Sequence, residues 1–515
     1  MQANTHQLGP TPLTRAQLVD IARHQGRVEL TPQAINNITT ARNHIDKLAT
    51  ENRPVYGIST GFGALAVRHI PTHRRTDLQR SFVRSHAAGA GNPVEVEVVR
   101  AAMALRLRTI ATGRTGVRPE TAHALADLLN TGITPVVGEH GSLGCSGDLA
   151  PLATIALALT GEGEVLTPSG QRRPAAEALA EAGLEPVTLG EKEGLALTNG
   201  TEGMLGMLVL ALHDLTALVD IADLTAAMSV EALLGTDRAF AADLQHLRPH
   251  PGQAVSAARM RAFLADSAII ASHRGPDCPR VQDAYSLRCA PQVHGAARDT
   301  IRHAETTADA ELAATIDNPV LLDDGRVESN GNFHGAPLAY VLDFLAIPVA
   351  DMASMAERRT DRMLDVARSH GLPAFLADDP GVDSGYMIAH YTQAAITAEL
   401  KRLAVPASVD SIPTSAMQED HVSMGWAAAR KLRAAINSLT TVLAVELLTA
   451  ARALDLRAPL QPAPATAAAR DLLRTRVPGP GPDRHTSPEI AAAEHLIRSG
   501  ELHHLITTHL GQEQP

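Results

Sequence analysis

Long stretches without helix breakers dominate the chain after residue 200. Apolar residues recur at three- and four-residue spacing from Gly203 to Leu234, from Tyr340 to Leu364 and from Val422 to Leu456, which predicts amphipathic helices. We expect the first helix to end at Gly235 and the second to kink at Pro348, because glycine favours helix ends and proline lacks the amide hydrogen that continues a helix. Helices of such length usually pack in bundles.

Signals for β-structure are weak. Phe, Trp and Tyr make up 3% of the 515 residues, and alternating β-branched runs between turns are few. The sequence therefore predicts a mainly α fold, a long-helix bundle with a smaller, loop-rich N-terminal region. Because the length exceeds the size at which one core usually stops growing, we expect several parts. These are a loop-rich helical region at 1–200, the central long-helix bundle at 201–460, and a proline-punctuated linker with a C-terminal helical tail at 461–515.

Charge and hydropathy argue against two kinds of partner. A net charge of -11 disfavours nucleic acid, whose phosphates are held by clustered Lys and Arg. The basic pair Arg358-Arg359 is flanked by Glu357 and Asp361, so we expect a solvated helix face there. Acidic residues interrupt the most apolar segment, 203–235, and we therefore predict a core helix and no membrane span.

Cysteine usage and the first residues point to the cytoplasm. The three cysteines, Cys145, Cys278 and Cys289, cannot form a disulfide framework and fit a reducing compartment. The start MQANTHQLGP lacks the basic and apolar regions of a secretory signal. The 23 histidines show no His-Glu-x-x-His or comparable spacing, so we predict no metal site.

The segment Gly141 to Asp148, Gly-Ser-Leu-Gly-Cys-Ser-Gly-Asp, carries the most unusual chemistry. Small residues on both sides of Ser146 let the backbone turn sharply. If the Gly147 nitrogen approaches the Cys145 carbonyl carbon, a ring can close with loss of water, and loss of the Ser146 hydroxyl then leaves an exocyclic methylene. Glycine at 147 leaves that approach unobstructed. The alternative is an anion-binding turn, with Asp148 as N-cap of a helix at Leu149 to Leu159.

Other loops rich in Gly, Ser and Asn carry further motifs. Together with the Gly141 to Asp148 segment, these motifs resemble those of the histidine ammonia-lyase family, from about Tyr56 to Trp426. That family lies within the aromatic amino-acid lyases and aminomutases that use a methylidene-imidazolone. The landmarks are Tyr56 to Gly63, Ser85 to Gly89, the Cys-Ser-Gly-Asp-Leu-Ala-Pro-Leu run from Cys145, Asn199 to Thr201, Gln282 to Arg288, Gly331 to His334 and Gln418 to Met424.

The resemblance implies a homotetramer whose active sites are shared between subunits. It also implies a 4-methylidene-imidazol-5-one, formed autocatalytically from Cys145, Ser146 and Gly147 in the N-terminal region, with no metal and no nucleotide. A β-proton is weakly acidic and an amino group leaves poorly, so elimination needs such an electrophile.

Two tyrosines are the candidates for proton handling. A phenol whose pKa is lowered by buried donors can act as a base. The resemblance implies that Tyr56 removes the β-proton and that Tyr285 lies beside the electrophile. Either tyrosine could instead be a core residue with a hydrogen-bonded tip.

The remaining candidates bind substrate. The planar guanidinium of Arg288 suits a carboxylate, unless it forms a structural ion pair. Asn199 and Gln282 offer amide donors, or simply cap loops. His86 and Glu419 together provide polar partners for both nitrogens of an imidazole, which a phenyl ring would leave unpaired. Phe333 is expected near the substrate, although a Phe is usually core.

The predicted reaction is nonoxidative elimination of ammonia from L-histidine to give urocanate. Cys145, Thr154, Glu202 and Ala284 depart from the residues we expect in the family and leave room for another substrate. The alternatives are an ammonia-lyase or aminomutase of the same chemistry acting on tyrosine, phenylalanine or a modified histidine, and a non-catalytic helical scaffold. A pyridoxal-phosphate lyase is disfavoured because no lysine lies in a recognisable cofactor loop.

Overall fold

The computed structural model describes residues 4–50, 55–275, 278 and 281–510. The chain forms two compact units, each assembled from three segments. The first unit contains Met1–Ala211, Glu305–Asp343 and Pro406–Arg430, and the second contains Leu212–Ala304, Phe344–Val405 and Lys431–Pro515. The predicted division into three consecutive regions, 1–200, 201–460 and 461–515, stays a prediction.

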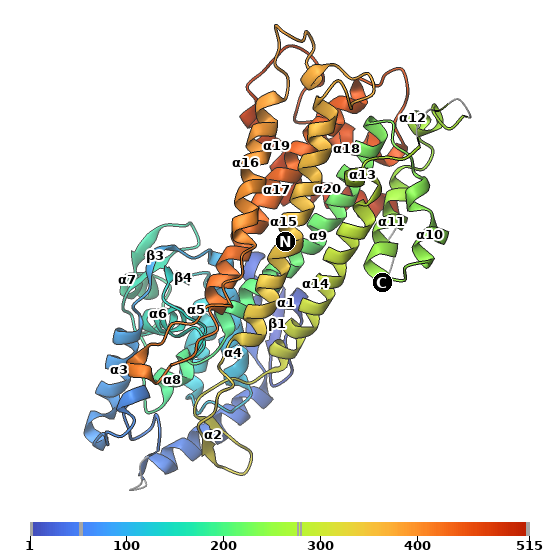
Figure 1. The fold of residues 1–515 in the computed structure, drawn as a ribbon. Coiled ribbons are helices and arrows are strands. Elements are labelled where there is room, and N and C mark those ends of the chain that lie inside the picture. Colours follow the sequence, from blue (N-terminus) through green and yellow to red (C-terminus); the bar gives the residue numbers. More distant parts are fainter. Residues whose placement is uncertain (1–3, 51–54, 276–277, 279–280, 511–515) are drawn as a thin grey trace. The chain divides into compact units, whose positions relative to one another are not determined.

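Four helices are longer than the others (Figure 1). By residue range, each begins in one unit and ends in the other. They are α9 (Glu202–Ala232), α14 (Ala290–Ala313), α15 (Ala336–Leu364) and α17 (Gly425–Asp455). The prediction of a mainly helical fold with long helices is confirmed.

Shorter helices make up most of the first unit. They are α1 (Arg15–Arg23), α2 (Pro32–Thr50), α3 (Arg75–His86), α4 (Val96–Ala111), α5 (Pro119–Asn130), α6 (Leu149–Leu159), α7 (Ala175–Glu181) and α8 (Glu193–Thr198). Helix α4 is buried along nearly all of its length and packs against α1, α2 and α5. The predicted helix at Leu149 to Leu159 is confirmed as α6.

The β-strands are short, and each pairing brings two loop regions of the chain together. β1 (Thr5–Leu8) pairs in parallel with β2 (Arg27–Leu30), and the other pairs are antiparallel. They are β3 (Ala90–Pro93) with β5 (Gly138–His140), the sheet of β4 (Thr134–Pro135), β6 (Glu164–Leu166) and β7 (Arg172–Pro174), and β8 (Val320–Leu321) with β9 (Val327–Glu328).

Short helices of the second unit surround its parts of the long ones. They are α10 (Ala242–His246), α11 (Pro251–Phe263), α12 (Ala268–Ala271), α13 (Tyr285–Arg288), α16 (Met387–Leu403), α18 (Pro464–Arg474), α19 (Thr486–Arg498) and α20 (Glu501–Leu510). Helices α18 and α19 pack against α20, and α11 packs against α18.

The stretch predicted as a linker contains a packed helix. Helix α18 begins at Pro464 and buries Ala469 and Leu473, so the segment after residue 461 belongs to the folded core of the second unit. Proline is compatible with this position because the first amide of a helix has no acceptor inside it. The prediction of a linker was therefore wrong for Pro464–Arg474, whereas the predicted C-terminal helical tail is present as α19 and α20.

Three helices are long and apolar enough to cross a membrane by length and composition alone: Glu193–Ala232, Ala336–Leu364 and Gly425–Asp455. The sequence predicts a core helix, and not a membrane span, for the segment 203–235. Within the protein, 78%, 61% and 78% of these windows are buried. Their apolar side chains therefore pack mainly against the protein's own core.

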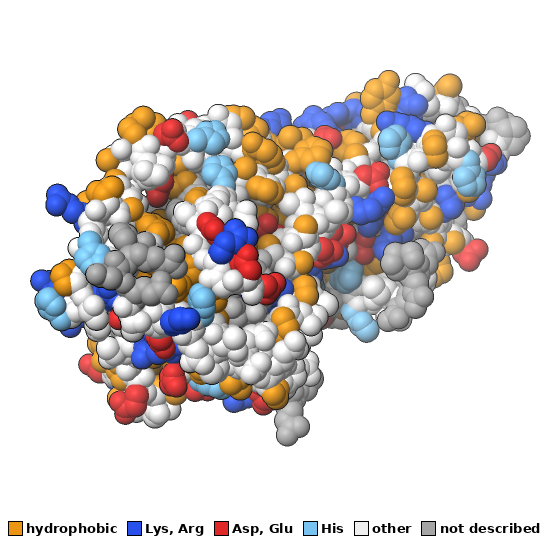
Figure 2. All heavy atoms as spheres, turned by 90° about the horizontal axis from the view of Figure 1, so that it is seen from below, with side chains coloured by type: hydrophobic (Ala, Val, Ile, Leu, Met, Phe, Trp, Pro, Cys, Tyr) orange, Lys and Arg blue, Asp and Glu red, His pale blue; other side chains and the backbone are white. Residues whose placement is uncertain are grey.

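Acidic and basic side chains are interspersed on the face shown in Figure 2. Arg358 follows the expectation of a solvated helix face, since its side chain is 56% exposed. Arg359 does not, because its side chain is completely buried against Glu446. The prediction for the Arg358-Arg359 pair was thus right for the first residue and wrong for the second.

Candidate active site

The segment from Gly141 to Asp148 is sharply bent, with a bend at each of residues 144–148. Gly147 has a φ of 72°, and a Cβ placed on it would lie 2.1 Å from the carbonyl oxygen of Gly200. The amide of Asp148 donates to the same carbonyl at 2.7 Å. Glycine is therefore required at 147 by backbone packing as well as by the turn.

Two landmark loops are attached to this segment within the first unit. The amide of Gly335 donates to the Gly144 carbonyl at 2.9 Å, and the Ser423 hydroxyl donates to the same carbonyl at 2.6 Å. Phe333 lies two residues before Gly335 and is half-buried, and Glu419 lies four residues before Ser423. Loops far apart in sequence thus meet around one carbonyl.

Asp148 is fully buried and caps a different helix from the one expected. It makes no side-chain bond at the start of α6. Its carboxylate instead accepts from the amide of Met204 in the first turn of α9 at 2.9 Å and from the Ser142 hydroxyl at 2.8 Å. Burial raises the pKa of Asp148 to about 7. One carboxyl group therefore links the bent segment to the start of a long helix.

Asn199 is buried at the end of α8, directly before Gly200. Its carbonyl accepts from Arg106 at 2.9 Å, and Arg106 also donates to the Ile316 carbonyl and pairs with Glu202 at 3.0 Å. The side-chain oxygen of Asn199 is buried and has no hydrogen-bond partner among the described residues. The backbone of Asn199 is thus fixed while its amide is not fully engaged.

His86 lies at the end of α3 with one nitrogen committed. Its Nδ1 lies 2.9 Å from the Phe82 carbonyl and 3.0 Å from the Ser85 hydroxyl, which itself donates to that carbonyl. A carbonyl can only accept, so a hydrogen bond to Phe82 puts the proton on Nδ1. Burial lowers the pKa of His86, although the Phe82 bond and the charge of Glu419 act in the opposite direction. Nε2 of the neutral ring is therefore an acceptor.

Glu419 has one engaged oxygen and one without a partner among the described contacts. Oε2 accepts from the Cys145 thiol at 3.6 Å and from the Thr414 hydroxyl at 3.2 Å. Burial, together with Glu419, raises the pKa of Cys145 to about 11, so the thiol keeps its proton. The first residue of the Cys-Ser-Gly triplet thus contacts the acid that sequence reasoning assigned to the substrate.

The loop that carries Tyr56 is connected to His86. Its phenol oxygen accepts from the amide of Gly63 at 3.2 Å. The ring of Phe62 packs on Phe82 with centroids 4.4 Å apart, and Phe82 packs on His86 with centroids 3.9 Å apart. Aromatic contacts therefore connect the loop of Tyr56 to His86.

Gln282, Tyr285 and Arg288 lie in the second unit, in or beside the single turn of α13. Tyr285 is 71% exposed, and the Arg288 guanidinium lies 4.7 Å from the centre of its ring. Nε of Arg288 is buried without a hydrogen-bond partner among the described residues. Asp283 anchors the loop by accepting from the Thr236 amide at 2.7 Å.

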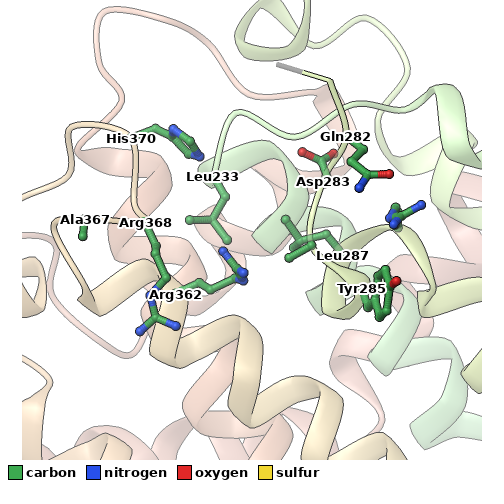
Figure 3. Close-up of a pocket in the computed structure, with 11 residues that line it drawn as sticks. Leu233, Gln282, Asp283, Tyr285, Leu287, Arg362, Ala367, Arg368 and His370 are labelled. Carbon is green, nitrogen blue, oxygen red and sulfur yellow. The ribbon is translucent and has the colours of Figure 1, made fainter. Parts of the chain in front are cut away.

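A cavity of about 470 Å³ opens beside these residues. Figure 3 shows Gln282 and Tyr285 along one side, with Arg362, Arg368 and His370 on the other. These three basic residues come from the end of α15 and the loop that follows it, and sequence reasoning missed them. In the sequence they look like the charged residues found at many helix ends, so no sequence pattern distinguished them from ordinary surface residues.

The structure divides the predicted residues between the two units. Tyr56, His86, Cys145, Ser146, Gly147, Asn199, Phe333 and Glu419 belong to the first unit, and Gln282, Tyr285 and Arg288 to the second. In the first unit, the contacts above link the residues themselves or their neighbours in the same loops. Their assigned roles stay predictions. Among the described residues, no three His, Cys, Asp or Glu side chains are grouped so that they could hold a metal ion.

Comparison with known proteins defines the family. The profile described as "Aromatic amino acid lyase" matches residues 13–475. A histidine ammonia-lyase of Streptomyces coelicolor is 63% identical over 496 residues, covering 96% of this chain and 97% of the relative. The structure of histidine ammonia-lyase from Trypanosoma cruzi matches with a TM-score of 0.91 at 38% identity, covering 99% of this chain and 96% of that one.

A tyrosine aminomutase from Streptomyces globisporus has the same fold, with a TM-score of 0.92 and 36% identity over 98% of both chains. The chain belongs to the aromatic amino acid lyase family and is a carbon–nitrogen lyase. The resemblance inferred from the loop motifs is thereby confirmed.

Proposed function

We propose that this protein eliminates ammonia from L-histidine to give urocanate. The observation that carries the proposal is the arrangement of His86 and Glu419. His86 presents an acceptor nitrogen, and one Glu419 oxygen has no partner among the described residues, while Cys145 and Thr414 donate to the other. An imidazole ring offers an N–H donor to one of these acceptors, and to both when it is protonated, whereas a phenyl ring offers none.

The high identity to histidine ammonia-lyases supports the same substrate. The fold alone does not decide it, since tyrosine and phenylalanine aminomutases share it with TM-scores of 0.92 and 0.90. A lyase or aminomutase for another aromatic amino acid is the second candidate, and it is favoured only by this likeness of fold.

The Cys145-Ser146-Gly147 segment fits a methylidene-imidazolone. Closing that ring joins the Gly147 nitrogen to the Cys145 carbonyl carbon with loss of one water, and loss of the Ser146 hydroxyl releases a second. The missing side chain and left-handed backbone of Gly147 suit this closure, and only the backbone of residue 145 takes part. The group would supply an electrophilic carbon that makes the amino group a leaving group.

The chain's own residues would then hold the substrate and move its protons. Arg288 suits the carboxylate, because its guanidinium makes charge-assisted bonds and has a buried nitrogen with no partner in the described part of the chain. Tyr56 is the proposed base for the β-proton, since its oxygen accepts the Gly63 amide and can develop negative charge there. Asn199 and Gln282 would donate to developing charge, Tyr285 would lie near the electrophile, and Phe333 would pack against the substrate.

We further propose a homotetramer with active sites shared between subunits. Helix α15 exposes Tyr340, Phe344 and Ile347, which are 61%, 46% and 49% exposed and follow one another at helical spacing. An exposed apolar stripe of this kind is typical of a protein interface. The three cysteines are free, which suits action in the cytoplasm.

The test measures urocanate formation by ultraviolet absorbance with purified protein and a panel of aromatic amino acids. Histidine should be the best substrate, and Glu419→Gln and His86→Phe should each lower its kcat/KM by about 10- to 100-fold. Glu177→Gln, at an exposed ion pair of the same unit, is the control and should leave kcat/KM unchanged. A preference for tyrosine or phenylalanine, or indifference to both site variants, would refute the assignment.

Intact mass tests the electrophile separately. The wild-type chain should weigh two waters less than its sequence requires, and Ser146→Ala should prevent the loss of the hydroxyl and abolish turnover. A full-mass chain without activity would support the scaffold alternative.

A further inference from the structure

A completely buried ion pair joins two of the long helices in the second unit. Arg359 of α15 and Glu446 of α17 are both 0% exposed. Nε of Arg359 donates to Oε1 of Glu446 at 2.5 Å, and Nη2 donates to Oε2 at 3.0 Å. This paired geometry fixes both side chains more tightly than a single contact would.

Both carboxylate oxygens of Glu446 receive a second donor from α9. The hydroxyl of Thr225 donates to Oε2 at 2.8 Å, and that of Ser229 donates to Oε1 at 2.9 Å. The carboxylate is therefore fully hydrogen-bonded, which offsets part of the cost of burying its charge. Three helices thus hold the Arg359 guanidinium in one orientation.

The remaining end of that guanidinium supports α13. Nη1 of Arg359 donates to the carbonyl of Ser286 at 3.2 Å. Ser286 lies between Tyr285 and Arg288, in a helix of only four residues, and its side chain is buried. So short a helix has little rigidity of its own, because each of its ends leaves backbone groups without partners inside the helix.

We propose that Arg359 is a positioning residue, which acts through Ser286 to set the directions of Tyr285 and Arg288. The inference rests on the proposed function, because it assumes that these two residues handle the substrate. Glu446 is the group that holds Arg359 in place. A small displacement of α13 would move both side chains relative to the substrate, and catalysis is sensitive to such displacements.

The same unit contains a matched control. Arg298 pairs with Asp223 at 2.6 Å and with Asp220 at 2.8 Å, and Asp223 also contacts His294. Asp223 and His294 are completely buried. The contacts of this group fall on α9, α11, α14 and α20, and none of those described reaches α13. Its loss should weaken the second unit without displacing Tyr285 or Arg288.

The experiment compares Arg359→Lys with Arg298→Lys in the full-length protein. Lysine keeps the charge but cannot form the paired bonds or reach a third acceptor in the same plane. Both variants should melt earlier than wild type and still lose two waters. Arg359→Lys should lower kcat/KM for histidine by about 10- to 100-fold, with a rise in KM and a fall in kcat, while Arg298→Lys should stay within about threefold of wild type.

A double variant separates positioning from stability. Replacing a buried ion pair by apolar residues of similar volume often restores stability, so Arg359→Met with Glu446→Leu should melt closer to wild type than Arg359→Lys does. Its kcat should remain low because Ser286 has still lost its donor. Recovery of wild-type kcat and KM in the double variant, or equal kinetic losses in Arg359→Lys and Arg298→Lys, would overturn the inference.

The wild-type protein distinguishes this failure from that of the proposed function. If wild type forms no urocanate from histidine, the proposed function fails and the inference fails with it. If wild type is active but the two lysine variants behave alike, only the positioning role of Arg359 is refuted.

Discussion

Asp148→Asn should make the protein more stable at high pH and leave its stability nearly unchanged at low pH. The Asp148 carboxyl is completely buried, and its oxygens accept from the Met204 amide and the Ser142 hydroxyl. An asparagine has almost the same shape. Its oxygen can accept from Met204, and its amino group can donate to the Ser142 oxygen, so both contacts survive.

The magnitude follows from the pKa of Asp148, which burial raises from 3.8 to about 7. A raised pKa means that the folded protein binds the proton more tightly than the unfolded chain does. The stability contributed by the protonated form is full below pH 3.8 and is lost as pH rises towards 7. Since each tenfold change in proton affinity is worth about 1.4 kcal/mol, ionisation costs the wild-type fold roughly 4 kcal/mol by pH 8.

The assay is thermal unfolding of both proteins between pH 5 and pH 8, with Asp77→Asn as a control. Asp77 is an exposed partner of Arg74 and Arg80. The difference in Tm between Asp148→Asn and wild type should grow with pH, whereas the control should differ from wild type by a small, constant amount. A variant destabilised equally at pH 5 and pH 8 would show that Asp148 is already ionised in the folded protein.

Two further predictions concern the triplet. Gly147→Ala should abolish urocanate formation and leave the chain at full mass, because the added Cβ would lie 2.1 Å from the Gly200 oxygen. The control is Gly170→Ala, at a glycine with a similar φ of 79° and no neighbour within 4 Å. It should keep both the activity and the loss of two waters. Cys145→Ala should still lose two waters by intact mass, yet its KM for histidine should rise about 3- to 10-fold, because Glu419 loses the thiol donor. An unchanged KM would show that this contact does not orient Glu419.

Local patterns predicted much of the fold. The spacing from Gly203 to Leu234 became α9 (Glu202–Ala232), and the chain leaves that helix through Leu234, which has a φ of 53°. Pro348 lies inside α15, and the kink expected there stays a prediction. The clustered prolines after residue 459 were misleading, because a proline can start a packed helix as readily as it can punctuate a loop.

The candidate site was less accessible from sequence. The need for glycine at 147 could be argued without a structure, and the backbone there confirms it, whereas the part of Gly147 in ring formation stays a prediction. The contact of Cys145 with Glu419 joins residues 274 positions apart, and the Asp148 cap on α9 joins residues 56 positions apart. No local pattern carries information about either pairing.

The sequence by itself determined the helical class, the bent triplet and the family motifs, because these depend on residue type, spacing and backbone freedom within a few neighbours. Only the tertiary structure decided which charges are buried and what they support. Arg358 and Arg359 are adjacent and chemically alike, yet one faces solvent and the other is fixed by Glu446 beneath Ser286. Burial and ion pairing depend on which helices pack together, and that is set by contacts between distant parts of the chain.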